Sequence, residues 1–173
     1  MSGQDDAIGT AAGGASSRPR RRTRPEPSPA QRALALLVRR EHSRKELLQK
    51  LTIRGVPVAD ADAAVARMVA AGWQDDDRFA ESLVRSRVMS GYGPRRICAE
   101  LETHDLEGEC ARTALQDAGT DWAQQARDLV RRRYSRALAG DRAVQRKAAD
   151  FLLRRGYTMD QVRAATHPDP DGP

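Results

Sequence analysis

Apolar residues recur at helical spacing along this chain, and one such pattern occurs three times at intervals of about 50 residues. In each copy, apolar or small side chains stand at positions i, i+1 and i+4 of the run. The spacing puts each set on one stripe of a helix, so we expect all nine side chains to be buried. The aligned sets are Leu47, Leu48 and Leu51; Ile97, Cys98 and Leu101; and Ala148, Ala149 and Leu152.

Each copy also closes with the same helix-ending signal. Gly55 and Gly156 stand where a helix ends in left-handed backbone, and Asp105 takes that place in the middle copy. Glycine adopts this conformation freely because it has no Cβ, and Asp tolerates it at a small cost. We expect the next residue to pack back onto the last leucine of the run, as in a Schellman motif. These pairs are Val56 with Leu51, Leu106 with Leu101, and Tyr157 with Leu152.

Capping signals predict nine helices in three sets of three, with almost no strand pattern. Ser43 with Glu46, and Thr158 with Gln161, have the spacing of capping boxes. The seventh helix is predicted to end near Gly140. The other expected starts are at Ser28-Pro29, Val58, Asp75, Gly93-Pro94, Glu107, Thr120 or Asp121, and Asp141. The fold class is therefore predicted to be all-α, with three tandem three-helix repeats.

The same signals divide the chain into five parts. Residues 1–28 are rich in Arg, Pro and Gly and lack a core-forming pattern, so we expect a disordered tail there. The repeats are expected at residues 29–74, 75–119 and 120–167, followed by a flexible C-terminus at residues 168–173. Stacked repeats suit a long binding surface better than an enclosed active site.

Charge points to an anionic or acidic partner. The formal net charge is +6 with a pI near 10.0, and the first and third repeats are net basic whereas the middle one is net acidic. Such a mixed surface fits a protein partner, or a protein–nucleic acid assembly, better than it fits DNA alone. Aromatic residues make up only 4% of the chain, which disfavours a base-stacking platform.

Several basic residues are candidates for contacts with DNA or a protein partner. Lys45, Arg95 and Arg146 share one repeat position, which lies opposite the buried stripe, so they are expected to point outward. A soluble helix face explains them equally well, and one surface arginine contributes only about 0–1 kcal/mol, so several must act together. The full candidate set is Arg44, Lys45, Arg95, Arg96, Arg131, Arg132, Arg133, Arg136, Arg146 and Lys147.

No residue pattern predicts catalysis, a metal or a cofactor. The histidines and cysteines lack metal-ligand spacing, and Cys98 and Cys110 are interpreted as core residues. Asp75-Asp76-Asp77 favours a helix cap over a Mg²⁺ site, and Ser43 beside His42 favours a cap over a nucleophile. Trp73 is interpreted as a core or hinge residue. No apolar run is long enough for a bilayer, so we expect a cytoplasmic protein.

Taken together, several motifs resemble the RecX family, regulators of the bacterial RecA recombinase. The similar segments are Arg39–Leu47 with Arg54-Gly55; Gly72-Trp73 with Asp75-Asp76 and Arg78–Glu81; Gly91–Ile97 with Glu100-Leu101; and Phe151–Tyr157. They span about residues 30–166. One departure is Thr103-His104-Asp105, where the family pattern has a basic pair and Gly.

The resemblance implies an elongated, curved molecule of three three-helix units that has no catalytic residues. It also implies a monomeric, non-enzymatic regulator that binds in the groove of the RecA–DNA filament. Such a protein restrains ATP hydrolysis, strand exchange and co-protease activity in recombination, DNA repair and the SOS response. The alternative interpretation is an autonomous DNA-binding helical protein, which predicts tight, salt-dependent binding to naked DNA. A hydrolase is the third and least favoured hypothesis.

Overall fold

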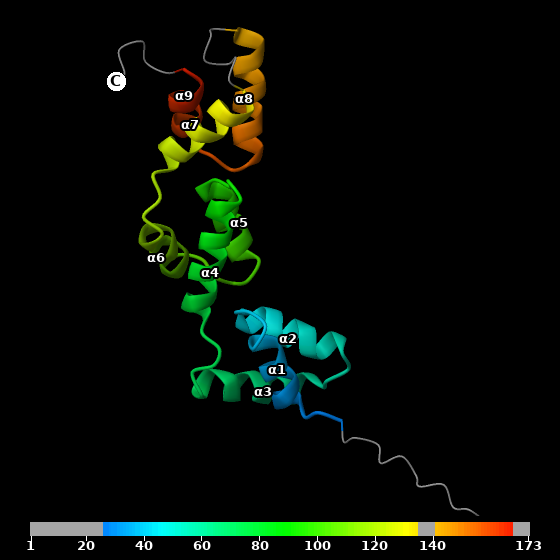
Figure 1. Cartoon of the computed structure of the whole chain (residues 1–173). Helices are drawn as coiled ribbons and strands as arrows, with labels where there is room; N and C mark the ends of the chain where they lie inside the picture. Colours follow the sequence, from blue (N-terminus) through cyan, green and yellow to red (C-terminus); the bar gives the residue numbers. More distant parts are fainter. Residues whose placement is uncertain (1–25, 135–140, 168–173) are drawn as a thin grey trace, which may run out of the picture.

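Helices are the only regular secondary structure in the part of the chain that the computed structural model describes, residues 26–134 and 141–167. They are α1 Pro29–Leu37, α2 Arg44–Ile53, α3 Val58–Ala70, α4 Asp76–Met89, α5 Pro94–Glu102, α6 Glu109–Asp117, α7 Trp122–Arg133, α8 Arg142–Arg154 and α9 Met159–Thr166. We call α1–α3 unit 1, α4–α6 unit 2 and α7–α9 unit 3. The units follow one another along a long axis (Figure 1). The predicted all-α fold of three tandem three-helix units is confirmed.

Each unit is built around its own apolar core. The most extensive helix contacts stay within one unit, as between α1 and α3, α4 and α6, and α7 and α9. Fully buried residues anchor the cores: Leu47, Leu51 and Val65 in unit 1; Val84, Ile97 and Leu101 in unit 2; and Val130, Leu152 and Tyr157 in unit 3. Burying a side chain of this size stabilises the fold by roughly 1.5–3 kcal/mol. Each unit therefore has its own hydrophobic core, and Trp122 of α7 packs against the cores of both unit 2 and unit 3.

The three helix endings adopt the predicted Schellman geometry. Gly55, Asp105 and Gly156 have φ angles of 81°, 60° and 87°. The amide of the next residue donates to the carbonyl of the last leucine in each copy. These bonds are Val56 to Leu51, Leu106 to Leu101, and Tyr157 to Leu152, each 3.1 Å long. The prediction that Asp105 replaces glycine in left-handed backbone is confirmed.

The nine-residue buried stripe is narrower than predicted. The i and i+4 residues of all three copies have no exposed surface, but Leu48, Cys98 and Ala149 are only half-buried. The reason is geometric, because position i+1 lies about 100° around the helix from position i and so falls at the edge of the stripe. Trp73, predicted to be a core or hinge residue, is 50% exposed.

One capping prediction needs correction. Ser43 Oγ accepts the Glu46 amide, but Glu46 does not return a bond to Ser43, because its carboxylate accepts from Arg40 and Lys50 instead. The boxes at Ser28 and Thr158 are reciprocal, with Gln31 and Gln161 respectively. Asp75 caps α4 as predicted, accepting the amides of two following residues.

Helix α7 ends at Arg133, well before the predicted end near Gly140. Tyr134 leaves helical backbone at φ −132°, and its ring packs edge-on against Phe151 at 5.7 Å. Residues 135–140 lie outside the described part of the chain, and Arg136 lies there with them. The predicted tails also fall outside it, except for residues 26–28.

Candidate functional site

The predicted basic residues occupy three places along the long axis. Arg44 and Lys45 begin α2, Arg95 and Arg96 begin α5, and the remaining described candidates lie on α7 and α8 of unit 3. All nine described candidates are exposed: Arg44, Lys45, Arg95, Arg96, Arg131, Arg132, Arg133, Arg146 and Lys147. The first two pairs therefore lie where one unit meets the next, which the sequence did not reveal.

Two contacts between consecutive units are built at equivalent positions. In both, the ending of the middle helix of one unit docks against the start of the middle helix of the unit before it. The ending of α5, at His104 and Asp105, meets the start of α2, and we call this contact the first joint. The ending of α8, at Arg155 and Gly156, meets the start of α5, and we call this contact the second joint.

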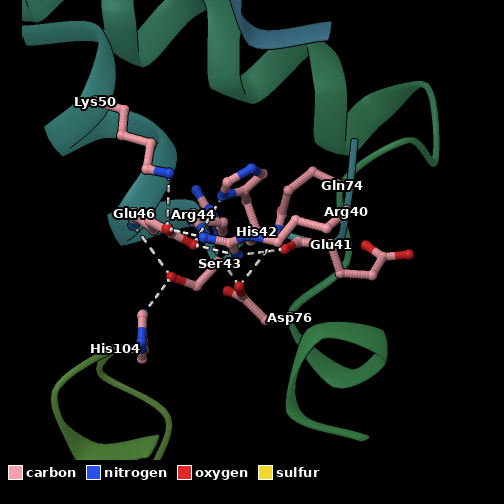
Figure 2. Close-up of polar contacts among 10 residues, drawn as sticks. All are labelled: Arg40, Glu41, His42, Ser43, Arg44, Glu46, Lys50, Gln74, Asp76 and His104. Atoms are coloured by element: carbon pink, nitrogen blue, oxygen red, sulfur yellow. Dashed lines mark hydrogen bonds and ion pairs between the residues drawn. The ribbon is translucent and has the colours of Figure 1, made fainter. Parts of the chain in front are cut away.

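Side chains make the first joint. His104 Nδ1 lies 2.9 Å from Ser43 Oγ, and Lys45 Nζ lies 2.7 Å from Asp105 Oδ1. The His104 ring also packs on Phe79 with centroids 4.7 Å apart. Figure 2 shows His104 approaching Ser43 from unit 2. Ser43, which is completely buried, thus both caps α2 and binds the next unit.

Further polar contacts fix the start of α2 to the start of α4. The Arg44 amide donates to Asp76 Oδ1 at 3.0 Å, and Arg78 Nε donates to Glu41 Oε1 at 3.0 Å. Gln74, which is buried in the link between the units, donates to Asp76 Oδ1 at 2.9 Å and contacts the His42 carbonyl at 3.3 Å (Figure 2). The first joint is therefore a network of charged and polar side chains.

The Glu46 carboxylate lies beside this joint and is surrounded by basic side chains. Burial alone would raise its pKa, but hydrogen bonds from Arg40 and Lys50, together with the nearby His42 ring, lower the pKa of Glu46 to about 2. The His42 ring is buried, and burial lowers its pKa more than the neighbouring carboxylate raises it. His42 Nδ1 lies 2.8 Å from Glu46 Oε2, in a close contact that is poorly aligned for a hydrogen bond. The favoured state is a carboxylate beside a neutral imidazole.

Backbone groups dominate the second joint. The Gly93 amide donates to the Arg155 carbonyl at 2.8 Å, and the Arg95 amide donates to the Gly156 carbonyl at 3.0 Å. The approach is so close that a Cβ on Gly93 would lie 2.5 Å from the backbone of Gly156, and a Cβ on Gly156 would lie 2.4 Å from the Arg96 nitrogen. Both glycines are therefore required by packing.

Tyr157 and Gln125 form a chain of hydrogen bonds at the buried side of the second joint. Tyr157 is 1% exposed, and its hydroxyl donates to Gln125 Oε1 at 2.8 Å. Gln125 Nε2 donates in turn to the Val88 carbonyl of α4 at 2.6 Å. Burial raises the pKa of Tyr157 to about 12, so its hydroxyl stays protonated as a hydrogen-bond donor.

Arginines and aromatic rings alternate across the second joint. The guanidinium carbons of Arg96 and Arg155 lie 5.1 and 5.2 Å from the centre of the Tyr92 ring. Arg155 and Arg133 lie 4.9 and 5.0 Å from the centre of the Phe151 ring. Arg133 also lies 5.9 Å from the Tyr134 ring. We call this row the arginine ladder: Arg96, Tyr92, Arg155, Phe151, Arg133 and Tyr134.

Family models match each of the three units. The RecX first, second and third three-helix domains match residues 31–68, 75–115 and 120–166. The chain belongs to the RecX family. Its similarity to the regulatory protein RecX of Stenotrophomonas maltophilia strain R551-3 is 56% identity over 152 residues, covering 87% of this chain and 93% of that protein. Against the RecX of Xanthomonas oryzae pv. oryzae strain MAFF 311018 the identity is 52%, covering 84% and 91%.

Solved RecX structures share the fold. The crystal structure of RecX from Lactobacillus salivarius aligns with a TM-score of 0.66 at 24% identity, covering 79% of this chain and 91% of that one. A second crystal structure of regulatory protein RecX aligns with a TM-score of 0.68 at 19% identity, covering 79% and 69%. At these identities the likeness establishes the architecture alone.

Within this RecX-family chain, the predicted basic residues do not form one patch. Lys45 is engaged in the first joint, and Arg131 lies 3.9 Å from Asp128 on its own helix. Arg96 and Arg133 belong to the arginine ladder, whose rings the sequence interpretation did not connect with them. The only available signal was the presence of aromatic residues beside basic ones at the helix ends.

The described residues were also compared with the requirements of a metal site, a reactive cysteine and a membrane-spanning helix. No cluster of three or more His, Cys, Asp or Glu side chains there has the placement of a metal site. Both cysteines are half-buried, and burial raises the pKa of Cys110 to about 11, which keeps it a neutral thiol. Cys98 was predicted to be a core residue. It instead lines a groove of about 510 Å³ between α5 and α6. No described helix has the length and apolar character needed to cross a bilayer.

Proposed function

We propose that this chain is a non-enzymatic regulator, mainly an inhibitor, of the RecA recombinase. It acts as a cytoplasmic monomer that lies in the groove of the RecA–DNA filament during recombination and DNA repair. Membership of the RecX family supports this role, and the similar proteins from Stenotrophomonas and Xanthomonas are named regulatory proteins.

The observation that carries the proposal is the row of three units with exposed arginines at separate places along it. Arg95 and Arg96 are exposed beside the second joint, and Arg131, Arg132 and Arg133 are exposed at the end of α7. A partner with repeating subunits would be contacted at several points at once, so weak individual contacts would add together. Bridging neighbouring subunits restrains the movements that ATP turnover requires.

The direct test is ATP hydrolysis by RecA on single-stranded DNA in the presence of increasing amounts of this protein. We expect the rate of hydrolysis to fall severalfold as the protein approaches the concentration of filament subunits. An unchanged rate at that ratio would contradict the proposal.

A charge-reversed variant locates the contact. Changing Arg131, Arg132 and Arg133 together to Glu is expected to weaken inhibition by tenfold or more in the amount of protein needed, roughly one factor of ten for every 1.4 kcal/mol lost. The matched control reverses three exposed arginines of unit 1, Arg39, Arg54 and Arg67, which make no ion pair with the described residues. Equal loss in both variants would show that net charge, and not this cluster, matters.

A further inference from the structure

The arginine ladder concentrates positive charge that the described part of the chain does not neutralise. Arg96, Arg133 and Arg155 make no ion pair with a described carboxylate, and both oxygens of nearby Glu100 already accept from Arg87. Arg96 and Arg155 share one ring and Arg155 and Arg133 share another, so like charges are held as near neighbours. Their mutual repulsion favours binding of an anion.

The three arginines are not equivalent. Arg155 Nη1 donates to the Ser90 carbonyl at 2.6 Å and contacts the Gly91 carbonyl at 3.2 Å, so it braces the second joint. The side chains of Arg96 and Arg133 are exposed and form no hydrogen bond with the described residues. Stacking on a ring restricts a guanidinium group while leaving its N–H edge available for a phosphate. Arg96 and Arg133 are therefore the binding groups, and Arg155 positions them.

We propose that the arginine ladder binds the phosphate backbone of a polynucleotide directly, without help from another protein. The ladder places fixed guanidinium groups in a row, which suits a strand that repeats its phosphates at regular intervals. Because the rings are already covered by arginines, the bases are not stacked on them, and binding is independent of sequence.

This inference deepens the proposed function by naming the surface that faces the DNA of the filament. It is nevertheless tested on the full chain with naked oligonucleotides, so its failure is distinguishable from failure to regulate RecA. Binding of a labelled single strand and of a duplex is measured by fluorescence anisotropy over a range of salt concentrations.

The test variant is Arg96→Gln with Arg133→Gln, which leaves the bracing Arg155 intact. We expect affinity at low salt to fall tenfold or more, and the salt dependence to become less steep by about 1.4 on single strands and about 1.8 on a duplex, as for two lost phosphate contacts. The matched control is Arg67→Gln with Arg163→Gln, which removes the same charge from exposed positions on α3 and α9. We expect the control to stay within twofold of the unchanged protein.

Three outcomes decide the matter. Loss of binding in the ladder variant but not in the control, with unaltered circular dichroism in both, supports the proposal. Equal affinities in the two variants overturn it. Binding of polyglutamate that depends on the ladder, combined with no binding of either oligonucleotide, also overturns it and assigns the ladder to an acidic protein surface. Arg96→Lys with Arg133→Lys keeps the charge but not the planar fork, and is expected to recover only part of the affinity.

Discussion

The two joints solve the same packing problem by opposite means. At the first joint, Asp105 has a side chain, and it reaches Lys45 while His104 reaches Ser43. At the second joint, Gly156 has none, and its carbonyl accepts directly from the amide of Arg95. The presence or absence of a side chain at this left-handed position therefore accompanies the difference between the joints. The first joint, with Asp105, is made by side chains, and the second, with Gly156, is made by the main chain. Units with the same fold can thus be joined by contacts that respond to different conditions.

Because the two joints are built from different groups, we expect them to respond to different changes. Charged side chains respond to salt and to protonation, because their attraction depends on screening and on the state of each group. Main-chain hydrogen bonds between closely packed glycines respond chiefly to shape, because an added methyl group has no room. Three changes test this distinction.

The largest expected effect comes from adding a methyl group at equivalent helix endings. In Gly156→Ala, strain of about 1–2 kcal/mol in left-handed backbone is joined by a collision with Arg96, for a total of about 3 kcal/mol or more. In Gly55→Ala, φ is similar but no described atom lies within 4 Å of the new Cβ, so only the strain is expected. Urea unfolding followed by circular dichroism measures both, and equal losses would show that the second joint is not closely packed.

A change of pH should lower the stability of the region beside the first joint in acid and of the second joint in alkali. His42 has a pKa below 6.5 in the folded protein and Glu46 has one of about 2 against an ordinary 4.5, so the unfolded chain binds more protons as pH falls below 6.5. Stability near the first joint is therefore lost progressively between pH 6.5 and 2, with roughly 2–3 kcal/mol from Glu46. Tyr157 has a pKa of about 12 against an ordinary 10, so stability at the second joint is lost above pH 10.

Urea unfolding over this pH range separates the two limbs. Glu46→Gln is expected to flatten the acid limb and leave the alkaline limb, whereas Tyr157→Phe is expected to do the reverse. An acid limb of unchanged slope in Glu46→Gln would argue against its role as the acid-sensitive group.

The smallest effect is expected from the ion pair across the first joint. Lys45 and Asp105 side chains are 49% and 72% exposed, so Lys45→Met should cost less than about 1 kcal/mol, and the loss should vanish in 1 M salt, where the screening length is about 3 Å. Arg95→Met is the matched control, since the equivalent Arg95 contributes its backbone amide to the second joint. Unfolding curves at low and high salt compare the two, and identical salt responses would remove the proposed difference between the joints.

Local signals in the sequence were sufficient for the fold. The register of Leu51, Leu101 and Leu152 and the left-handed position of Asp105 follow from residues only a few places apart, so a pattern can reveal them. The half-buried Cys98 shows the limit of such patterns, because the width of a buried stripe depends on what packs beside it.

The joints and the ladder depend on contacts that no local pattern encodes. Ser43 and His104 are 61 residues apart, and Arg155 and Ser90 are 65 apart, so the sequence interpretation assigned Ser43 to a cap and Arg155 to a helix ending alone. The outward position of Lys45 was expected, but its partner was not. For the first joint, the one visible clue was the departure at His104 and Asp105, two residues that make this contact.

The helix endings also determine where the array can grow by duplication. The ending at Gly55 is of the kind that seats on a preceding unit, yet its Cβ position is open in the described part of the chain. The opposite face differs, because α8 begins at Arg142, about three residues earlier than α2 and α5 do in the common register. A following unit would meet this extra turn. A unit joined after unit 3 would therefore have to accommodate this turn, whereas the ending at Gly55 has the geometry of the two endings that seat on a preceding unit.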